Sequence, residues 1–288
     1  MKFISIARVI IKNVLRHLNL RKKVTVNSHT IVIPVQGGVG ASNVFIKKHE
    51  TWLNAVIGHY YKGNGAFIDV GVNLGQTLIK FKTLFPEGKY VGFEPNPNCV
   101  AYVASLIKEN YWTGVRLVCS GLSFENTVSP MFFDIEDSTS TQSSATFVEG
   151  YRLSTKRKVG LYMPTINLDQ FFAQVYDTNI ELVKIDVEGG ELMVLEGMRH
   201  LLKREKPLVV VEILPASREN ASLRNDLNRK INNFIRDIDF DLYEIIEGDN
   251  QFELNHIQEV PSDKADLVNY NYLLVPHETK AVNRNMVN

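Results

Sequence analysis

The 288-residue chain lacks most of the features that would assign it to a specialised class of protein. No apolar run approaches the roughly 18 residues of a membrane-spanning helix. Lysine plus arginine number 32, as do aspartate plus glutamate, so the overall charge gives no reason to expect a nucleic-acid partner. No repeat of solenoid length is present. We therefore expect an ordinary globular protein with one core and an extension.

Cysteine is scarce, since Cys99 and Cys119 are the two in the chain. Two thiols cannot form a disulfide framework, and their spacing matches no zinc site or redox motif. Both lie in or beside apolar segments, where free cysteine is commonly buried. We predict that both are reduced core residues of a cytoplasmic protein.

The N-terminal segment places apolar residues at a helical spacing over residues 1–20, with basic residues on another face. It lacks the continuous apolar core and the small-residue cleavage site of a secretory signal peptide. We predict an amphipathic helix and hold two interpretations of it. It packs on the domain or on a partner subunit, or residues 1–23 lie on an anionic membrane at its inner face.

Residues 1–60 form a predicted N-terminal extension, with a short hairpin at 24–26 and 30–35 and a helix at 49–61. From residue 61 to 280 we expect the main domain, in which strands and helices alternate. The expected strands are 67–70, 90–94, 115–119, 180–186 and 208–213, and the expected helices are 75–85, 98–110, 168–176, 191–202 and 222–238. This alternation predicts an α/β fold with a parallel sheet covered by helices on both faces. Strands at 241–246 and 270–275 are expected to pair antiparallel at one edge.

One long insertion interrupts the alternation. Residues 137–144 are a run of serine, threonine and other polar residues, and Lys156, Arg157 and Lys158 follow as a basic cluster. The run is interpreted either as a solvated loop or as a flap over a polar substrate, because long insertions in compact domains are often functional.

Four expected strands carry an acid at or near their carboxyl ends: Asp69, Glu94, Asp186 and Glu212. In an open parallel sheet, ligands bind at these ends. The four acids therefore predict a single site.

A glycine turn follows the first of these acids. Gly71 permits positive φ or a close approach of the backbone, and Gly75 lies where exposed N–H groups of a helix favour negative charge. The spacing is not that of a pyrophosphate-binding G-x-G-x-x-G motif. Glu94 lies about 20 residues after the turn, where an acid accepts both hydroxyls of a ribose. These residues indicate an adenosine-containing ligand and leave NAD open.

Three sequence blocks together resemble a known family. They are Phe67-Ile68-Asp69-Val70-Gly71-Val72-Asn73-Leu74-Gly75, Phe93-Glu94-Pro95-Asn96-Pro97 and Val183-Lys184-Ile185-Asp186-Val187-Glu188-Gly189-Gly190-Glu191. With the strand that ends at Glu212, they resemble the FkbM family of S-adenosylmethionine-dependent methyltransferases. The resemblance covers about residues 65 to 276, and the block around Asp186 is its most specific part.

The resemblance implies a Rossmann-like class I methyltransferase fold, with a seven-stranded, mostly parallel sheet whose last strand is antiparallel. It implies S-adenosylmethionine as cofactor and transfer of methyl to a hydroxyl, often of a sugar or polyketide. By the same resemblance, Asp69, Gly71 and Gly75 shape the methionine-side pocket, Asn73 lines it and Glu94 holds the ribose. Ser120, after the third strand, would lie by the adenine.

The methyl-transfer site must then lie near Asp186, Glu188 and Glu212. One interpretation makes Glu188 or Asp186 a general base. A second makes Asp186 and Glu212 half of a magnesium site, although no third ligand is evident. A third has Glu188 or Glu191 simply cap the next helix. No histidine has a local partner pattern that marks it as a base.

These features predict a cytoplasmic O-methyltransferase for a small-molecule or glycan acceptor: a sugar hydroxyl in a glycan, a lipid-linked precursor or a secondary metabolite. Two alternatives stay open at this point. One is a Rossmann-type oxidoreductase that uses NAD, and the other is a binding module that has lost the transfer reaction.

Overall fold

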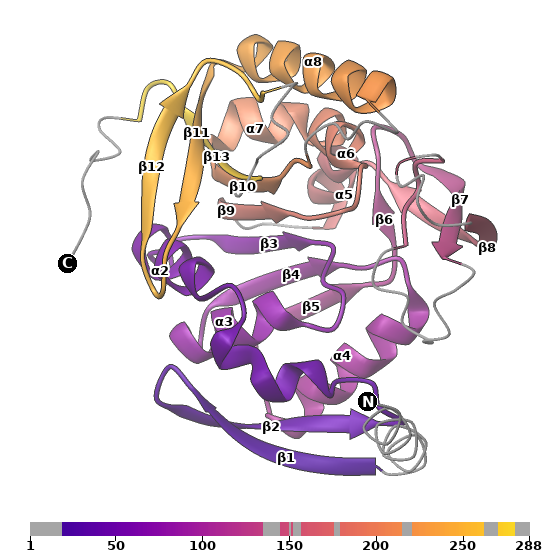
Figure 1. Cartoon of the computed structure of the whole chain (residues 1–288), viewed down its shortest axis with the longest axis vertical. Coiled ribbons are helices and arrows are strands. Elements are labelled where there is room, and N and C mark those ends of the chain that lie inside the picture. The colour runs from indigo at the N-terminus through magenta and orange to yellow at the C-terminus, as the bar shows by residue number, and fades with distance from the viewer. Residues whose placement is uncertain are drawn as a thin grey trace, which may run out of the picture.

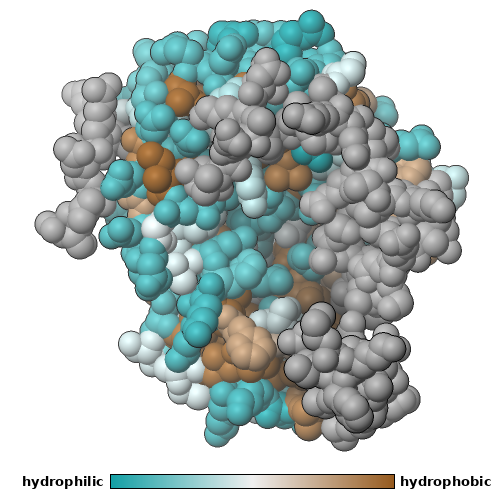
Figure 2. All heavy atoms as spheres, in the orientation of Figure 1, coloured by the Kyte–Doolittle hydropathy of each residue, from teal (hydrophilic) through white to brown (hydrophobic). Residues whose placement is uncertain are grey.

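The computed structural model describes residues 19–134, 145–149, 151, 157–175, 179–214, 221–261 and 270–279. The N-terminal helix expected over residues 1–20 and the polar run 137–144 lie outside these ranges, apart from Asn19 and Leu20. Within the same ranges, no helix is long and apolar enough to cross a membrane. Mostly hydrophilic residues cover the described part of the face in Figure 2, with apolar residues in smaller patches between them.

A central sheet of eight strands organises the molecule (Figure 1). Its order is β12-β11-β13-β10-β9-β3-β4-β5. The strands are β3 (Ala66–Val70), β4 (Lys89–Phe93), β5 (Val115–Val118), β9 (Ile180–Ile185), β10 (Leu208–Glu212), β11 (Phe240–Glu247), β12 (Phe252–Ile257) and β13 (Asn271–Pro276). The strands β10, β9, β3, β4 and β5 run parallel, and β13 is antiparallel to both of its neighbours.

The predicted sheet is therefore confirmed in its mostly parallel order and its antiparallel last strand. The count of seven strands was wrong, because β12 adds an eighth at the edge beside β11. Its burial alternates only weakly and most of its side chains reach solvent. A strand at a sheet edge needs little alternation of apolar and polar residues. The sequence of β12 therefore shows no clear strand pattern.

Helices cover both faces of the sheet. On one face lie α2 (Thr51–Tyr60), α3 (Gln76–Leu84) and α4 (Pro97–Glu109), which share a core with Phe67 and Tyr90. On the other lie α5 (Leu168–Val175), α6 (Glu191–Gly197), α7 (Arg199–Glu205) and α8 (Ala221–Asp237), which share a core with Ile68 and Val183. Alternate residues of one strand point to opposite faces, so Phe67 and Ile68 enter different cores.

An N-terminal hairpin of β1 (Asn19–Val26) and β2 (His29–Gln36) packs its apolar side against Ile79 and Leu106. The 3-10 helix η1 (Ser42–Lys48) joins this hairpin to α2. The predicted hairpin is confirmed and is longer than the apolar residues alone suggested.

A second, three-stranded sheet lies within the insertion. Its order is β6-β8-β7, formed by β6 (Gly121–Leu122), β7 (Thr127–Asp134) and β8 (Arg157–Ile166). Phe132 also pairs with Thr146, so residues 145–149 lie against this sheet. The sheet places Leu122, Met131 and Phe147 beside the carboxyl ends of the central strands, where they line one wall of a cavity.

The two cysteines differ in exposure. Cys99 is buried on α4, as predicted. Cys119, also predicted to be a core residue, is exposed. It directly follows β5, an edge strand with only partly buried side chains, so the apolar run before it does not lead into the core.

Candidate active site

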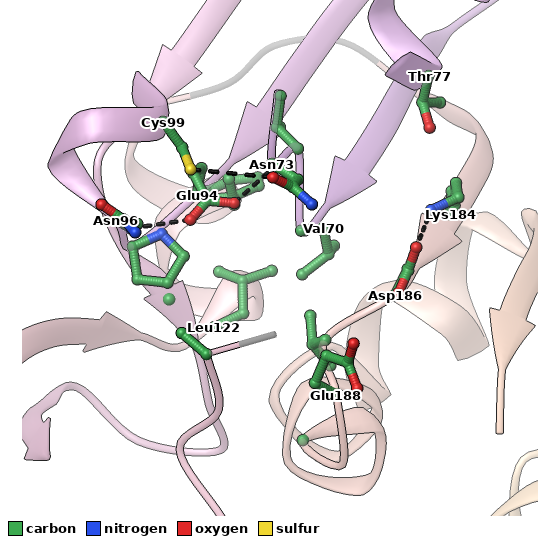
Figure 3. Close-up of a pocket in the computed structure, with 18 of the residues that line it drawn as sticks. Val70, Asn73, Thr77, Glu94, Asn96, Cys99, Leu122, Lys184, Asp186 and Glu188 are labelled. Carbon is green, nitrogen blue, oxygen red and sulfur yellow. Dashed lines mark hydrogen bonds and ion pairs between the residues drawn. The ribbon is translucent and has the colours of Figure 1, made fainter. Parts of the chain in front are cut away.

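A cavity of about 440 Å³ opens where β3, β4, β9 and β10 end. Seven of the nine predicted site residues line it: Gly71, Asn73, Glu94, Ser120, Asp186, Glu188 and Glu212. Asp69 and Gly75 do not. In Figure 3, Glu94 and Asn73 lie on one side of the open space, the Lys184–Asp186 pair lies on the other, and Glu188 lies below.

Glu94 forms a fixed acceptor at the end of β4. Its Oε2 accepts a hydrogen bond from the backbone N–H of Asn73 at 2.8 Å, and its Oε1 accepts one from the N–H of Asn96 at 2.8 Å. Both oxygens keep further lone pairs. Burial raises the pKa of Glu94 to about 7, although the two N–H donors oppose this change. Hydroxyl donors from a ligand would favour its charged form.

The glycine turn is shaped by the protein's own backbone. Gly71 has φ +92°, and a Cβ built there would lie 1.9 Å from the carbonyl oxygen of Asp186. The N–H of Asp186 donates to the carbonyl of Val70 at 3.0 Å, so the chain after β9 continues alongside the turn. The close approach that the glycine permits is therefore to the neighbouring strand. Asn73 also has a positive φ, +50°, and its N–H donates to Glu94.

Gly75 ends the glycine turn and packs against α4. It precedes α3 with φ +78°, and its N–H donates to the carbonyl of Val72 at 2.8 Å. A Cβ there would approach Leu106 on α4 at 3.1 Å. Its position at a helix start is as predicted, but its contacts are with the core.

Asp69 is fully buried behind the cavity. One of its oxygens accepts a hydrogen bond from the Tyr90 hydroxyl, and the other has no hydrogen-bond partner in the described part of the chain. Burial raises the pKa of Asp69 to about 6, against the influence of Lys184 and Tyr90. Asp69 does not line the cavity, but its charge helps to raise the pKa of Lys184, which does.

Lys184 and Asp186 form an ion pair at the end of β9. The Nζ of Lys184 lies 2.8 Å from Oδ2 of Asp186, and both residues line the cavity. Burial alone would lower the pKa of Lys184, but the charges of Asp186, Asp69 and Glu50 hold it above its usual range. Lys184 is thus a permanent cation beneath the site.

Glu212 lies next to this pair at the end of β10, as expected for adjacent parallel strands. Burial, followed by the charge of Asp186, raises the pKa of Glu212 to about 9, while Lys184 acts in the opposite direction. Glu212 is therefore harder to ionise than an ordinary glutamate, and it is Asp186 that contacts the ammonium group of Lys184.

The two remaining acids differ in role. Glu191 is buried, and its Oε1 accepts a hydrogen bond from the N–H of Gly189 at 2.9 Å. It therefore braces the turn before α6. It does not cap the helix as one interpretation proposed, because the N-cap is Gly190 and no side chain caps it. Glu188 lines the cavity with φ +54°, and its carbonyl accepts from the Thr146 hydroxyl at 2.6 Å. This bond ties the turn after β9 to the insertion.

Ser120 lines the cavity, but its hydroxyl is already engaged. Its Oγ lies 2.9 Å from the carbonyl oxygen of Gly121 and 3.0 Å from that of Pro164. These contacts hold the start of β6 against β8. Its place by an adenine stays a prediction.

The donor set does not suit magnesium. Asp186 and Glu212 are adjacent, but the ammonium group of Lys184 already lies against Asp186. In the ranges that the structure describes, no three His, Cys, Asp or Glu side chains come together in a way that could hold a metal ion. The positive charge beside Asp186 is therefore the protein's own, supplied by Lys184.

Several cavity residues gave no usable sequence signal, among them Ser42, His49, Glu50, Thr77, Cys99, Met131 and Phe147. His49 and Glu50 come from the segment before α2, more than 130 residues from Lys184 in sequence. Met131 and Phe147 come from the insertion. Only the folded chain brings these distant segments to the strand ends.

The raised pKa values predict that the ligand-free protein loses stability as pH rises from 6.5 to 9. The folded-state pKa values of Glu94 and Glu191 are about 7 and that of Glu212 is about 9, all above the unfolded value. The folded state therefore holds more protons in this window, and unfolding becomes easier as they are lost. Thermal unfolding at constant ionic strength measures this effect.

A matched pair of variants tests which group causes the loss of stability with rising pH. Glu212→Gln should flatten the fall in Tm between pH 8 and 9, whereas Glu253→Gln, at an exposed position on β12, should leave it unchanged. A slope that is the same in both variants would show that Glu212 does not titrate there.

Comparison with known proteins places the chain among methyltransferases. The model of the methyltransferase FkbM domain matches residues 69–242. The chain belongs to the FkbM methyltransferase domain family. Its order of strands, with an antiparallel β13, is the Rossmann-like class I methyltransferase fold that the sequence predicted.

The individual proteins that this FkbM-domain protein resembles share little sequence identity with it. Methyltransferase sdnD of Sordaria araneosa is 26% identical over 157 residues, which are 47% of this chain and 61% of that protein. The chain thus spans less than two thirds of this curated relative. The methyltransferase FkbM of Methylobacillus flagellatus KT is 12% identical, with a TM-score of 0.45 over 75% of this chain and 44% of that one. Aeropyrum pernix fibrillarin, solved with S-adenosyl-L-methionine, is 9% identical, with a TM-score of 0.45 over 88% of this chain and 82% of that one.

Proposed function

We propose that this protein transfers a methyl group from S-adenosylmethionine to a hydroxyl oxygen. The observation that carries the proposal is Glu94, a buried carboxylate that faces the cavity from the end of β4, with its two oxygens held by backbone N–H groups. Such an acid suits the two hydroxyls of a ribose. Membership in a methyltransferase family supports a methyl donor rather than a nicotinamide cofactor.

In this proposal, one end of the cavity binds the methyl donor and the other binds the acceptor. Glu94, Asn73 and the turn at Gly71 would hold the donor, while Asp186, Glu188 and Glu212 line the side left for the acceptor. When bound, S-adenosylmethionine supplies an electrophilic methyl group. The chain itself orients the acceptor hydroxyl in line with that group, which accounts for much of the rate of a displacement reaction. The apolar side chains of Leu122, Met131 and Phe147 also line the cavity and would keep water away from a bound donor.

For the acceptor we propose a sugar hydroxyl, in a glycan, a lipid-linked precursor or a secondary metabolite, methylated in the cytoplasm. Carboxyl groups suit hydroxyl-rich ligands because they accept several hydrogen bonds. The N-terminal residues 1–23 would bring the enzyme to the inner face of a membrane if the acceptor is lipid-linked. Flotation with anionic liposomes, with and without these residues, tests that contact.

A transfer assay tests the function directly. Purified protein, S-adenosylmethionine labelled in the methyl group, and an extract of a null strain, which contains unmethylated acceptor, are incubated together. We expect label in a carbohydrate fraction, and none when wild-type extract replaces the null extract. Absence of label in every fraction would contradict the proposed transfer and favour a binding module without catalysis.

Calorimetry separates the donor from the NAD alternative. We expect S-adenosylhomocysteine to bind and NADH not to bind at matched concentrations, because the turn lacks the G-x-G-x-x-G spacing for a pyrophosphate. Binding of NADH alone would favour the oxidoreductase.

A further inference from the structure

One histidine lines the cavity and is partly exposed. His49 follows η1 and lines the same cavity as Asp186 and Glu94. Of the described histidines, it is the one that does so. It lies outside residues 69–242, which the family model matches. Its side chain is 60% exposed, so an acceptor entering the cavity could reach it.

A partly buried acid lies beside this histidine. The Nδ1 of His49 lies 3.4 Å from Oε2 of Glu50, and the same oxygen lies 3.1 Å from the Nζ of Lys80 on α3. Burial alone would raise the pKa of Glu50, but the contact with His49 and the charges of Lys80 and Lys184 hold it well below its usual range. Glu50 is therefore an anion throughout the working pH range.

The backbone fixes this arrangement. Glu50 has φ +44°, a left-handed conformation that costs a residue with a side chain roughly 1–3 kcal/mol. Such strain persists only where surrounding contacts determine it, and here the buried Lys80 determines the position of the Glu50 carboxylate. When Nδ1–H donates to Glu50, the lone pair of Nε2 is left to accept a proton.

The other groups along the cavity are less suited to take a proton. Asp186 is already paired with Lys184 at 2.8 Å, and Glu212 lies beside Asp186, whose charge makes Glu212 harder to ionise. Glu94 is held by two backbone donors on the ribose side. Glu188 also lines the cavity on the acceptor side, but a carboxylate is a weaker base near neutral pH than an imidazole.

We propose that His49 is the general base of the methyl transfer and that Glu50 positions it. The inference rests on the proposed function. In the step, the acceptor O–H bond breaks and its proton moves to Nε2 of His49. The acceptor oxygen forms the new bond to the methyl carbon, and the electron pair of the broken carbon–sulfur bond stays on sulfur. The products are a methyl ether, S-adenosylhomocysteine and a protonated His49.

The transfer assay with the null-strain extract, combined with calorimetry of S-adenosylhomocysteine, tests this role. His49→Gln should lower the transfer rate by about 100-fold or more and leave the Kd for S-adenosylhomocysteine within about threefold. His49→Ala should behave likewise, and imidazole added to the buffer should restore part of its rate. Glu50→Gln should lower kcat without changing the KM for S-adenosylmethionine. His200→Gln, an exposed histidine on α7, is the matched control and should keep the full rate.

The results of these assays distinguish an error in the role of His49 from an error in the proposed function. If His49→Gln transfers methyl at the wild-type rate while Glu188→Gln does not, Glu188 is the base and the inference is wrong. If His49→Gln loses affinity for S-adenosylhomocysteine, His49 binds the donor and the inference is also wrong. If the wild-type protein binds no S-adenosylhomocysteine, the proposed function fails and the base role falls with it. Selective loss of transfer with imidazole rescue supports the role of His49.

Discussion

Replacing Glu94 by alanine should raise the Kd for S-adenosylhomocysteine by roughly 100-fold or more. Two hydrogen bonds from ribose hydroxyls to a charged acceptor contribute about 1.5–3 kcal/mol each. The variant also leaves the N–H groups of Asn73 and Asn96 without the acceptor that fixes the turn. Both effects act on the donor end of the cavity. Isothermal titration calorimetry measures the change.

Two further variants define what is lost. Glu94→Gln keeps the shape of the side chain but replaces one acceptor oxygen by a donor, so it should also bind weakly. Glu87→Gln changes an exposed acid just before the same strand and should bind as the wild type does. If Glu94→Ala binds S-adenosylhomocysteine with unchanged affinity, the ribose does not lie on Glu94.

Replacing Gly71 by alanine should lower the Tm by about 10 °C and abolish binding of the donor. The positive φ costs roughly 1–3 kcal/mol, and the crowding of a new methyl group in a packed site costs roughly 1–3 kcal/mol more. Each kcal/mol lowers Tm by about 2–4 °C in a domain of this size. Because the new Cβ would lie 1.9 Å from the Asp186 carbonyl oxygen, relief of the clash must move Asp186 as well.

Gly63→Ala separates the two causes. Gly63 has φ +86°, but nothing lies within 4 Å of a Cβ built there. This variant should therefore show the cost of the backbone conformation without the clash. Equal losses of Tm in Gly63→Ala and Gly71→Ala would contradict the role given to the turn, because the clash with the Asp186 carbonyl oxygen would then add nothing.

Local patterns were sufficient for the parallel core of the fold. Each of β3, β9 and β10 is a short apolar run with an acid in it or directly after it, and a helix with an apolar face separates one from the next. Because parallel strands all end at one edge, the acids Glu94, Asp186 and Glu212 could be assigned to one site without knowing the order of the strands. The glycine turn was also predictable, though its close contact with the Asp186 backbone was not.

Other parts of the site depend on contacts between distant segments. Asp69 looks like a strand-end acid in the sequence, but it lies one residue short of the end and its side chain points into the core that contains Phe67 and Tyr90. Glu50 acquires its partner Lys80 only when α3 packs against the segment before α2. The sheet in the insertion pairs β7 with β8 across residues 135–156, and no short-range pattern predicts that pairing.

A crystal structure of the protein with S-adenosylhomocysteine tests the central claim most directly. We predict that both ribose hydroxyls lie within hydrogen-bonding distance of the Glu94 carboxylate. We also predict that the sulfur faces the space bounded by Asp186, Glu188 and His49. A ligand whose ribose lies away from Glu94, or whose sulfur faces the apolar wall of Met131 and Phe147, would contradict the claim.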